Sequence, residues 1–169
     1  DDIDFGYVGE VDGVEYTVVD EETLRQMIDN GEDVSNVCTS KIFLMNNLFR
    51  GSDFNGNISS WDVSMVGSME YMFMDSKFNG DISYWDVSRV GNMDYMFLSF
   101  NKSCEFNQDI SNWDVSNVSN MNQMFSGHKT FNQDLSSWNV ESVIRCNMFS
   151  SSTPQWTLPK PNFTNCNPN

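Results

Sequence analysis

One string of residues recurs four times along this chain of 169 residues. It reads FNGNISSWDVSMVGSMEYMF from Phe54, FNGDISYWDVSRVGNMDYMF from Phe78, FNQDISNWDVSNVSNMNQMF from Phe106 and FNQDLSSWNVESVIRCNMF from Phe131. A catalytic site needs to be made only once, whereas repetition at this period is typical of an architecture built from equivalent units. The repeat therefore limits the fold more than any other feature of the sequence.

Apolar residues within a unit follow the pattern I-x-x-W-x-V-x-x-V-x-x-M-x-x-M-F. The alternation at Trp and Val predicts a short strand, and the later spacing of three and four predicts a helical turn. A single unit buries too little apolar surface to offset the entropy of ordering it, so neighbouring units must stack, with Trp on Trp and Phe on Phe. We therefore predict an α/β solenoid of the leucine-rich-repeat kind, a right-handed coil stack. Short parallel strands would form one face, and short helices or 3₁₀ segments the other.

The repeats divide the chain into an array and two ends. The N-terminal cap, 1–30, is predicted to hold a strand in GVEYTVVD and a helix that begins after Asp20 and ends at Gly31. The C-terminal cap, 150–169, contains all four prolines. A degenerate first unit precedes the four clear ones. The five predicted units within 31–149 are 31–49, 54–73, 78–97, 106–125 and 131–149.

The composition excludes several classes of function. Nine Lys and Arg against 24 Asp and Glu give a net charge of -15, which argues against nucleic acid or anionic lipid as partners. No apolar run approaches the roughly 18 residues of a membrane-spanning helix. The sequence offers no acid–base pair, no nucleophile beside a base and no phosphate-binding loop, so we expect no enzyme. The single histidine, His128 in SGHKT, is expected to be a solvated loop residue.

The four cysteines match no zinc-binding spacing. Cys146 falls near the position that a core Met occupies in other units, so a disulfide with Cys166 would fix the C-terminal cap. Cys38 and Cys104 are given no partner. An oxidising compartment is the expected location.

The outward positions of the predicted strands form columns from unit to unit. One column holds Asp62, Asp86 and Asp114. These carboxylates accept backbone N–H bonds at turns, or bind a cation (calcium on oxygen ligands) or a basic peptide, or are solvated side chains that splay apart. Otherwise no cofactor is expected. The asparagine ladder (Asn55, Asn79, Asn107, Asn132) is expected to satisfy turn backbone, and the tryptophans are expected in the core. The candidate ligand-binding residues are Asp62, Tyr84, Asp86, Arg89, Asn112 and Asp114.

The string FNQDISNWDVSNVSNMNQMF resembles the repeat of BspA-like bacterial surface proteins, which are leucine-rich-repeat relatives, and the lead-in to the repeats resembles that of secreted proteins from marine Bacteroidetes. This resemblance implies an extracellular, non-catalytic module for recognition or adhesion. Its partner would be a host or neighbouring-cell protein or a glycan. We expect a monomeric module of a larger secreted protein; the alternative is a structural spacer or stalk domain, stabilised by calcium.

Overall fold

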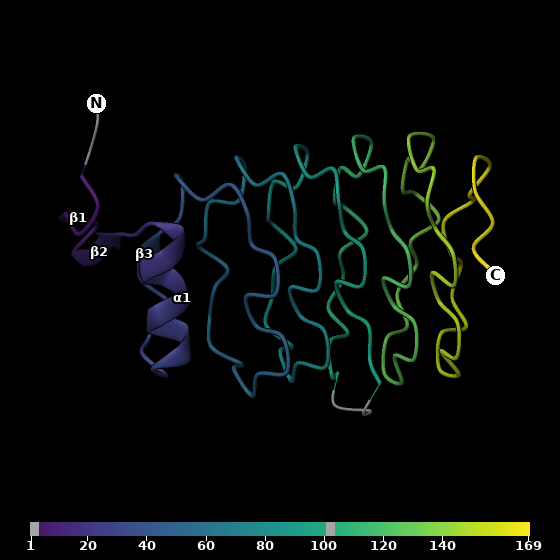
Figure 1. Ribbon diagram of the computed structural model, residues 1–169, viewed down its shortest axis with the longest axis horizontal. Coiled ribbons are helices and arrows are strands. Elements are labelled where there is room, and N and C mark those ends of the chain that lie inside the picture. The colour runs from purple at the N-terminus through teal and green to yellow at the C-terminus, as the bar shows by residue number, and fades with distance from the viewer. Residues whose placement is uncertain (1–3, 101–103) are drawn as a thin grey trace.

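The computed structural model describes residues 4–100 and 104–169, and within them all helices and strands lie in the first 38 residues. Strand β1 (Val8–Val11) pairs antiparallel with β2 (Val14–Val18), and β2 pairs in parallel with β3 (Val37–Cys38). Helix α1 (Glu21–Asp29) connects β2 to β3. From this end the irregular repeat units follow one another in chain order to the C-terminus at the far end (Figure 1).

The β1–β2 hairpin turns at Asp12 and Gly13, whose φ angles of 52° and 79° are both positive. Two positive φ angles in a two-residue loop match the right-handed twist of the flanking strands, which is why Asp-Gly is favoured there. β2 lies within the predicted strand, whereas β1 is not among the predicted elements.

Helix α1 begins where the sequence predicts, because the Asp20 carboxylate accepts a 2.7 Å hydrogen bond from the Thr23 N–H. Leu24 is buried, and Gly31 follows the helix with φ of 72°, a left-handed conformation that glycine adopts without a steric penalty. With nine residues α1 is far shorter than a bilayer is thick, and no other helix in the described residues is a candidate to cross a membrane.

The predicted α/β solenoid is wrong. Beyond Cys38 the described residues form no strand or helix, so the strand face and the helical face of a leucine-rich-repeat coil are both missing. What remains is one helix, a small open sheet and a series of turns. Neighbouring units touch through isolated parallel bridges, namely Leu44 to Ser68, Ser68 to Asn92, Asn92 to Asn120 and Asn120 to Arg145.

The reason is that apolar residues three positions apart lie at the two ends of β-turns and not on one face of a helix. In the second unit Trp61 N–H donates to Ile58 C=O at 3.1 Å, and Met72 N–H donates to Met69 C=O at 3.2 Å. The turn from Met69 to Met72 does not extend into a helix, because Tyr71, the residue before Met72, has a positive φ. The same left-handed conformation recurs in every unit, at Asn47, Tyr71, Tyr95, Gln123 and Met148.

Backbone groups that the turns leave unpaired bond to the next unit. Phe49 N–H donates to Met72 C=O, and Phe73 N–H donates to Met96 C=O, both at 2.9 Å. The last unit is offset by one residue from the predicted alignment, because Phe125 N–H reaches Phe149 C=O instead of the residue before it. Phe149 therefore occupies the position of a core Met, and its ring meets Phe125 edge-on at 76°.

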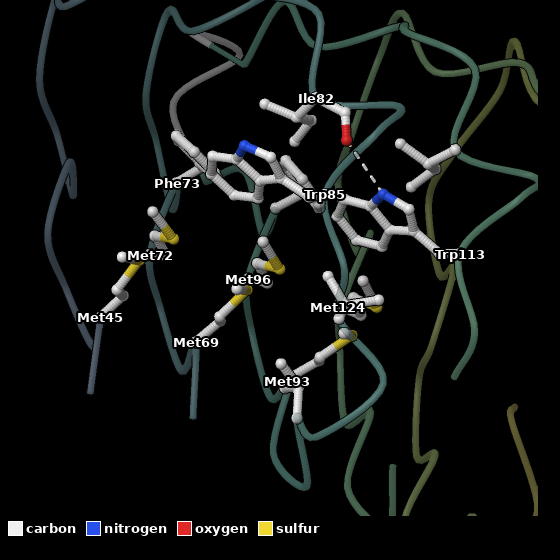
Figure 2. Packing of buried hydrophobic residues seen from close by; sticks show 14 of the residues in the cluster. Met45, Met69, Met72, Phe73, Ile82, Trp85, Met93, Met96, Trp113 and Met124 are labelled. Carbon is white, nitrogen blue, oxygen red and sulfur yellow. Dashed lines mark hydrogen bonds between the residues drawn. The ribbon is translucent and has the colours of Figure 1, made fainter. Parts of the chain in front are cut away.

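The core is a continuous row of aromatic and Met side chains (Figure 2). Indole rings of Trp61 and Trp85 lie parallel with centroids 6.4 Å apart, and Phe73 and Phe97 lie parallel at 5.4 Å. Each repeat Trp is no more than 4% exposed and donates its indole N–H to a carbonyl one unit earlier, as Trp113 does to Ile82 at 3.1 Å. The tryptophans are therefore core residues that also fix the register of neighbouring units.

The C-terminal segment closes the far end of this core. The Trp156 ring packs edge-on against Phe131 at 4.8 Å, and its indole N–H donates to Gln133 C=O at 2.9 Å. Residues 1–3 of the predicted N-terminal cap, and residues 101–103 between the predicted units 78–97 and 106–125, lie outside the described part of the chain.

Candidate functional site, the acidic face

The columns of exposed polar residues lie on turns that the repeat places at equivalent positions. Three of these columns together form what we call the acidic face. They are the column of Ser60, Tyr84, Asn112 and Ser137, the column of Asp62, Asp86, Asp114 and Asn139, and the column of Met65, Arg89, Asn117 and Ser142. All six predicted ligand-binding residues belong to this face and have exposed side chains. The face is carried by turns and not by the strands that the sequence analysis predicts.

Each aspartate of the acidic face is held by its own turn. Oδ1 of Asp62 accepts from Ser64 N–H at 3.0 Å and from Ser64 Oγ–H at 2.6 Å. The backbone N–H two residues on also donates to Asp86 at 3.1 Å and to Asp114 at 3.0 Å. A short polar side chain that bonds the backbone two residues on is an Asx-turn. The aspartates therefore accept backbone N–H bonds, which is one of the interpretations that the sequence left open for this column.

These hydrogen bonds favour the ionised carboxylate. Bonds from the Ser88 side chain and backbone lower the pKa of Asp86, and those from Ser116 lower the pKa of Asp114. A weaker opposing effect on Asp86 is repulsion from Asp114, whereas Arg89 favours the charged form. Asp86 thus lies within electrostatic range of both residues, and the face is negative at neutral pH.

A second acidic column lies one turn earlier in each unit. Asp81 and Asp109 each accept the backbone N–H two residues on at 2.9 Å, and Asp134 does so at 3.0 Å. Backbone and side-chain bonds from Ser83 lower the pKa of Asp81, and side-chain and backbone bonds from Ser136 lower that of Asp134. Both columns therefore combine a fixed backbone with an exposed charge.

The calcium alternative for Asp62, Asp86 and Asp114 finds no support in the geometry. No group of three or more His, Cys, Asp or Glu side chains within residues 4–100 and 104–169 is placed to hold a metal ion. Each of the three carboxylates is directed to its own turn. The column is an arrangement of separate Asx-turns and not a set of converging ligands.

Tyr84 is the most exposed large side chain of the face. Its exposed fraction is 90%, whereas the other members of its column are small polar residues. Arg89, one turn further along the chain, contacts the Met65 sulfur with Nη1 at 3.1 Å. Asn112 follows Tyr84 in the column of the next unit and is also exposed. Within the described part of the chain no hydrogen bond or ring contact joins Tyr84 to Arg89 or Asn112, so the three residues share a face without forming a closed site.

The asparagine ladder serves the backbone. Oδ1 of Asn55 accepts the Asn79 N–H at 2.8 Å, and Oδ1 of Asn79 accepts the Asn107 N–H at 2.9 Å. Gln108 adds a bond from Nε2 to the Asn79 carbonyl at 2.9 Å. These amides link one unit to the next, as predicted, and are not available as a ligand site.

Two groups of residues near the surface were not predicted from the sequence. Tyr71 and Tyr95 stack at 4.6 Å and 3°, with the Arg50 guanidinium 5.4 Å from the Tyr71 ring. The common M-x-Y-M-F ending of their units is the signal that could have found this pair. The second group is a pocket where the β1–β2 hairpin meets the acidic face, lined in part by Val11 and Tyr16. No local pattern indicates it, because its walls come from the hairpin and from two repeat units.

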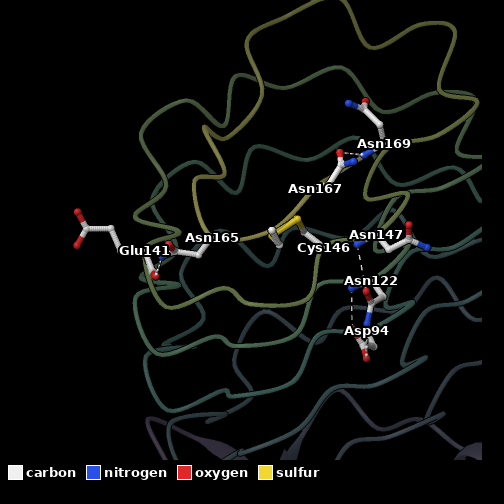
Figure 3. Close-up of a disulfide and its surroundings, with 9 residues drawn as sticks. Asp94, Asn122, Glu141, Cys146, Asn147, Asn165, Asn167 and Asn169 are labelled. Carbon is white, nitrogen blue, oxygen red and sulfur yellow. Dashed lines mark hydrogen bonds between the residues drawn. A yellow bond between two sulfur atoms is a disulfide. The ribbon is translucent and has the colours of Figure 1, made fainter.

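The cysteines and the histidine complete the inventory of reactive groups. A disulfide joins Cys146 to Cys166, the pair that the sequence suggested, and lies near an Asp94–Asn122–Asn147 ladder (Figure 3). Cys38 and Cys104 are free. Burial raises the pKa of the Cys104 thiol to about 11. The expected exposure of His128 is wrong, because its side chain is fully buried.

The comparisons with known proteins correct the resemblance. The matching family is described as "Mycoplasma protein of unknown function, DUF285", and its match covers residues 21–103 and 98–157. The identification with BspA-like leucine-rich-repeat surface proteins is therefore wrong, in agreement with the missing strands and helices of the repeat units. No curated protein and no solved structure matches the chain. Because the match covers most of its length, the chain belongs to the DUF285 family.

Proposed function

We propose that this chain is a non-catalytic, extracellular recognition module that binds a protein or a glycan through the acidic face. The observation that carries the proposal is the Tyr84 side chain, 90% exposed within a column of small polar residues. An aromatic ring held in water contributes nothing to the core, whereas aromatic residues are enriched among those that dominate binding energy. The column is therefore not uniform, whereas the columns of a spacer would be uniform.

The backbone beneath the face favours binding. Its turns are closed internally, its other groups bond to neighbouring units, and its aspartates are fixed by Asx-turns. A rigid scaffold loses little conformational entropy when a partner docks, so more of the contact energy appears as affinity. Recognition residues on such turns are positioned before the partner arrives.

The reactive side chains support a role without catalysis. His128 is buried, and burial lowers its pKa to about 4, so at neutral pH the ring is uncharged and has no access to substrate. The Cys104 thiol is buried with a raised pKa, which leaves little thiolate. A buried, uncharged imidazole and a buried, protonated thiol are typical of side chains that support the structure.

An extracellular location is supported by the disulfide, since such bonds persist chiefly in oxidising compartments. A high negative charge also suits a protein that must remain soluble outside the cell.

A spacer remains the second candidate because the described chain begins and ends at opposite ends of the row of units (Figure 1). This arrangement would separate whatever lies before and after it. A spacer would not require the exposed tyrosine or the pocket beside the acidic face.

The test is a screen of the labelled chain on arrays of surface proteins and glycans. For any partner found, Tyr84→Ala is expected to weaken binding by about thirtyfold, the effect of a typical central aromatic contact. The melting temperature should stay unchanged, because the side chain is not packed. Ser137→Ala, in the same column two units on, is the matched control and should bind as the wild type does. A partner that tolerates Tyr84→Ala, or a wild-type chain that binds nothing on the arrays, would favour the spacer.

A further inference from the structure

The acidic face ends in a pocket at its junction with the N-terminal hairpin. The cavity holds about 280 Å³, near the lower end of the range for ligand pockets. Three segments of the chain line it. Val11 and Tyr16 come from the β1–β2 hairpin, Val37 and Cys38 from β3, and Asp62 from the following unit. Cys38 and Asp62 occupy the same column in successive units, so the pocket is continuous with the acidic face.

The walls of the pocket are mostly apolar, although Thr39, Ser40 and Ser60 also line it, and Asp62 is the one carboxylate among them. Val11, in one of these walls, is 62% exposed. Asp62 supplies the charge. Both of its hydrogen bonds from Ser64 end on Oδ1, and no donor in the described part of the chain reaches Oδ2. The site therefore offers an apolar channel and a single open carboxylate oxygen.

We propose that this pocket binds a lysine side chain of a polypeptide partner. The four methylenes of lysine would lie along Val11, Tyr16 and Val37, and the ammonium group would donate to Oδ2 of Asp62. Because Oδ1 is already occupied, the carboxylate cannot form the two parallel bonds that favour arginine, whereas a point-like ammonium needs only one oxygen. This inference rests on the proposed function, since it names the partner chemistry at one end of the same face.

Charge complementarity selects this occupant over an uncharged one. Asp86 and Asp114 continue the Asp62 column away from the pocket, and their lowered pKa values keep them ionised. A partner with further basic residues beyond the anchoring lysine would meet this column. The field also accelerates the approach of a basic partner at low ionic strength.

The experiment is a titration of the full chain with N-acetyl-lysine methylamide, followed by amide NMR shifts. N-acetyl-norleucine methylamide is the control ligand, because it is apolar and lacks the ammonium group. We expect saturable shifts centred on Val11, Tyr16, Val37 and Cys38, with the lysine probe about fivefold tighter, the size of an exposed charge contact. Equal affinity for both probes, tighter binding of an arginine probe, or shifts spread evenly over the aspartate columns would overturn the proposal.

A matched pair of variants isolates the role of Asp62. Asp62→Asn should remove the preference for lysine over norleucine and leave the fold intact. Asn139 already fills this column in the last unit, where it accepts the Glu141 N–H at 3.1 Å. Asp114→Asn makes the same charge change two units away and should leave the preference unchanged. Loss of the preference in both variants would mean a diffuse charge effect and would refute a specific site.

Alkylation of Cys38 gives an independent readout. Cys104 is 2% exposed and the other two cysteines are in a disulfide, so iodoacetamide should react first with the half-exposed Cys38. Saturating lysine probe should slow this reaction several-fold, and norleucine at the same concentration should slow it less. An unchanged rate would contradict occupancy of the pocket. An array partner that needs Tyr84 but tolerates Asp62→Asn would refute the lysine pocket while the proposed function stands.

Discussion

The buried histidine predicts a loss of stability in mild acid. His128 Nδ1 accepts the Phe131 N–H at 3.2 Å, so the proton of the neutral ring lies on Nε2. Nε2 is buried and has no hydrogen-bond partner among the described residues. The aromatic rings of Phe125 and Phe131 lie 6.4 and 6.0 Å from the imidazole. A second proton on Nδ1 would oppose the Phe131 N–H and place a charge in this apolar site.

The magnitude follows from the pKa. Burial lowers the pKa of His128 from 6.5 to about 4, a difference of about 2.5 units, and each unit corresponds to about 1.4 kcal/mol. Because the folded-state pKa is the lower one, the unfolded chain binds the proton first as pH falls. The contribution is complete above pH 6.5 and is lost between 6.5 and 4. We expect the free energy of unfolding to fall by about 2 to 3 kcal/mol between pH 7.5 and 4.5 from this group alone.

The measurement is urea unfolding by Trp fluorescence across this range, with His128→Asn as the control. Ser52 and Ser76, which stand at the equivalent position, accept the N–H two residues on, so a neutral acceptor suits the site. The variant should be less stable at pH 7.5 but should lose less stability on acidification. The carboxylates with lowered pKa values act at lower pH, near and below 3.8, so their effect is separable.

The only histidine of the chain also gives one resolved imidazole signal for NMR titration. A midpoint near 4 is expected. A midpoint near 6.5, or parallel pH profiles for the wild type and His128→Asn, would refute the reasoning.

Three further perturbations test the packing and the surface. Trp85→Ala should lower the free energy of unfolding by about 3 to 5 kcal/mol in urea titrations, because the ring is 4% exposed and its indole N–H bonds to Ile58; a loss under 1 kcal/mol would contradict a core role. Cys166→Ser should cost about 3 kcal/mol, as expected for cross-linking residues 20 apart, and dithiothreitol should have the same effect on the melting temperature of the wild type but none on the variant. Millimolar calcium should leave the melting temperature unchanged, since the aspartates bond to separate turns; a rise of several degrees would restore the metal interpretation.

Much of the packing was predictable because each unit repeats the same inward positions. The buried Trp, Phe and Met columns follow from one apolar pattern read four times. The exposure of Asp62, Asp86 and Tyr84 follows from the same alignment, since residues between inward positions must face out. Asp20 and Gly31 mark the helix by local chemistry that needs no tertiary information.

The secondary structure of the units was not predictable from spacing. An apolar residue at every third position fits one face of a helix, but it also fits a series of β-turns, and periodicity alone does not separate them. Interruption by a positive φ at Tyr71 and Tyr95 has no sequence signal, because neither residue favours that conformation. Glycine or asparagine at these positions would have indicated it.

The burial of His128 and the pocket at Val11 and Asp62 were also not predicted from the sequence. His128 lies in a short polar stretch that reads as a loop, and its burial follows only when Phe125 and Phe131 close over it. The pocket at Val11 and Asp62 requires the hairpin to pack beside the second unit, a contact across about fifty residues that no local pattern encodes.

Hydrogen exchange of the full chain, free and bound to a partner captured from the arrays, tests the central claim most directly. The account predicts slower exchange at the backbone amides of the acidic face, around Asp62, Tyr84 and Asp114, and at the pocket beside Val11. Slower exchange confined to the surface around Tyr71 and Tyr95, with the acidic face unchanged, would contradict it.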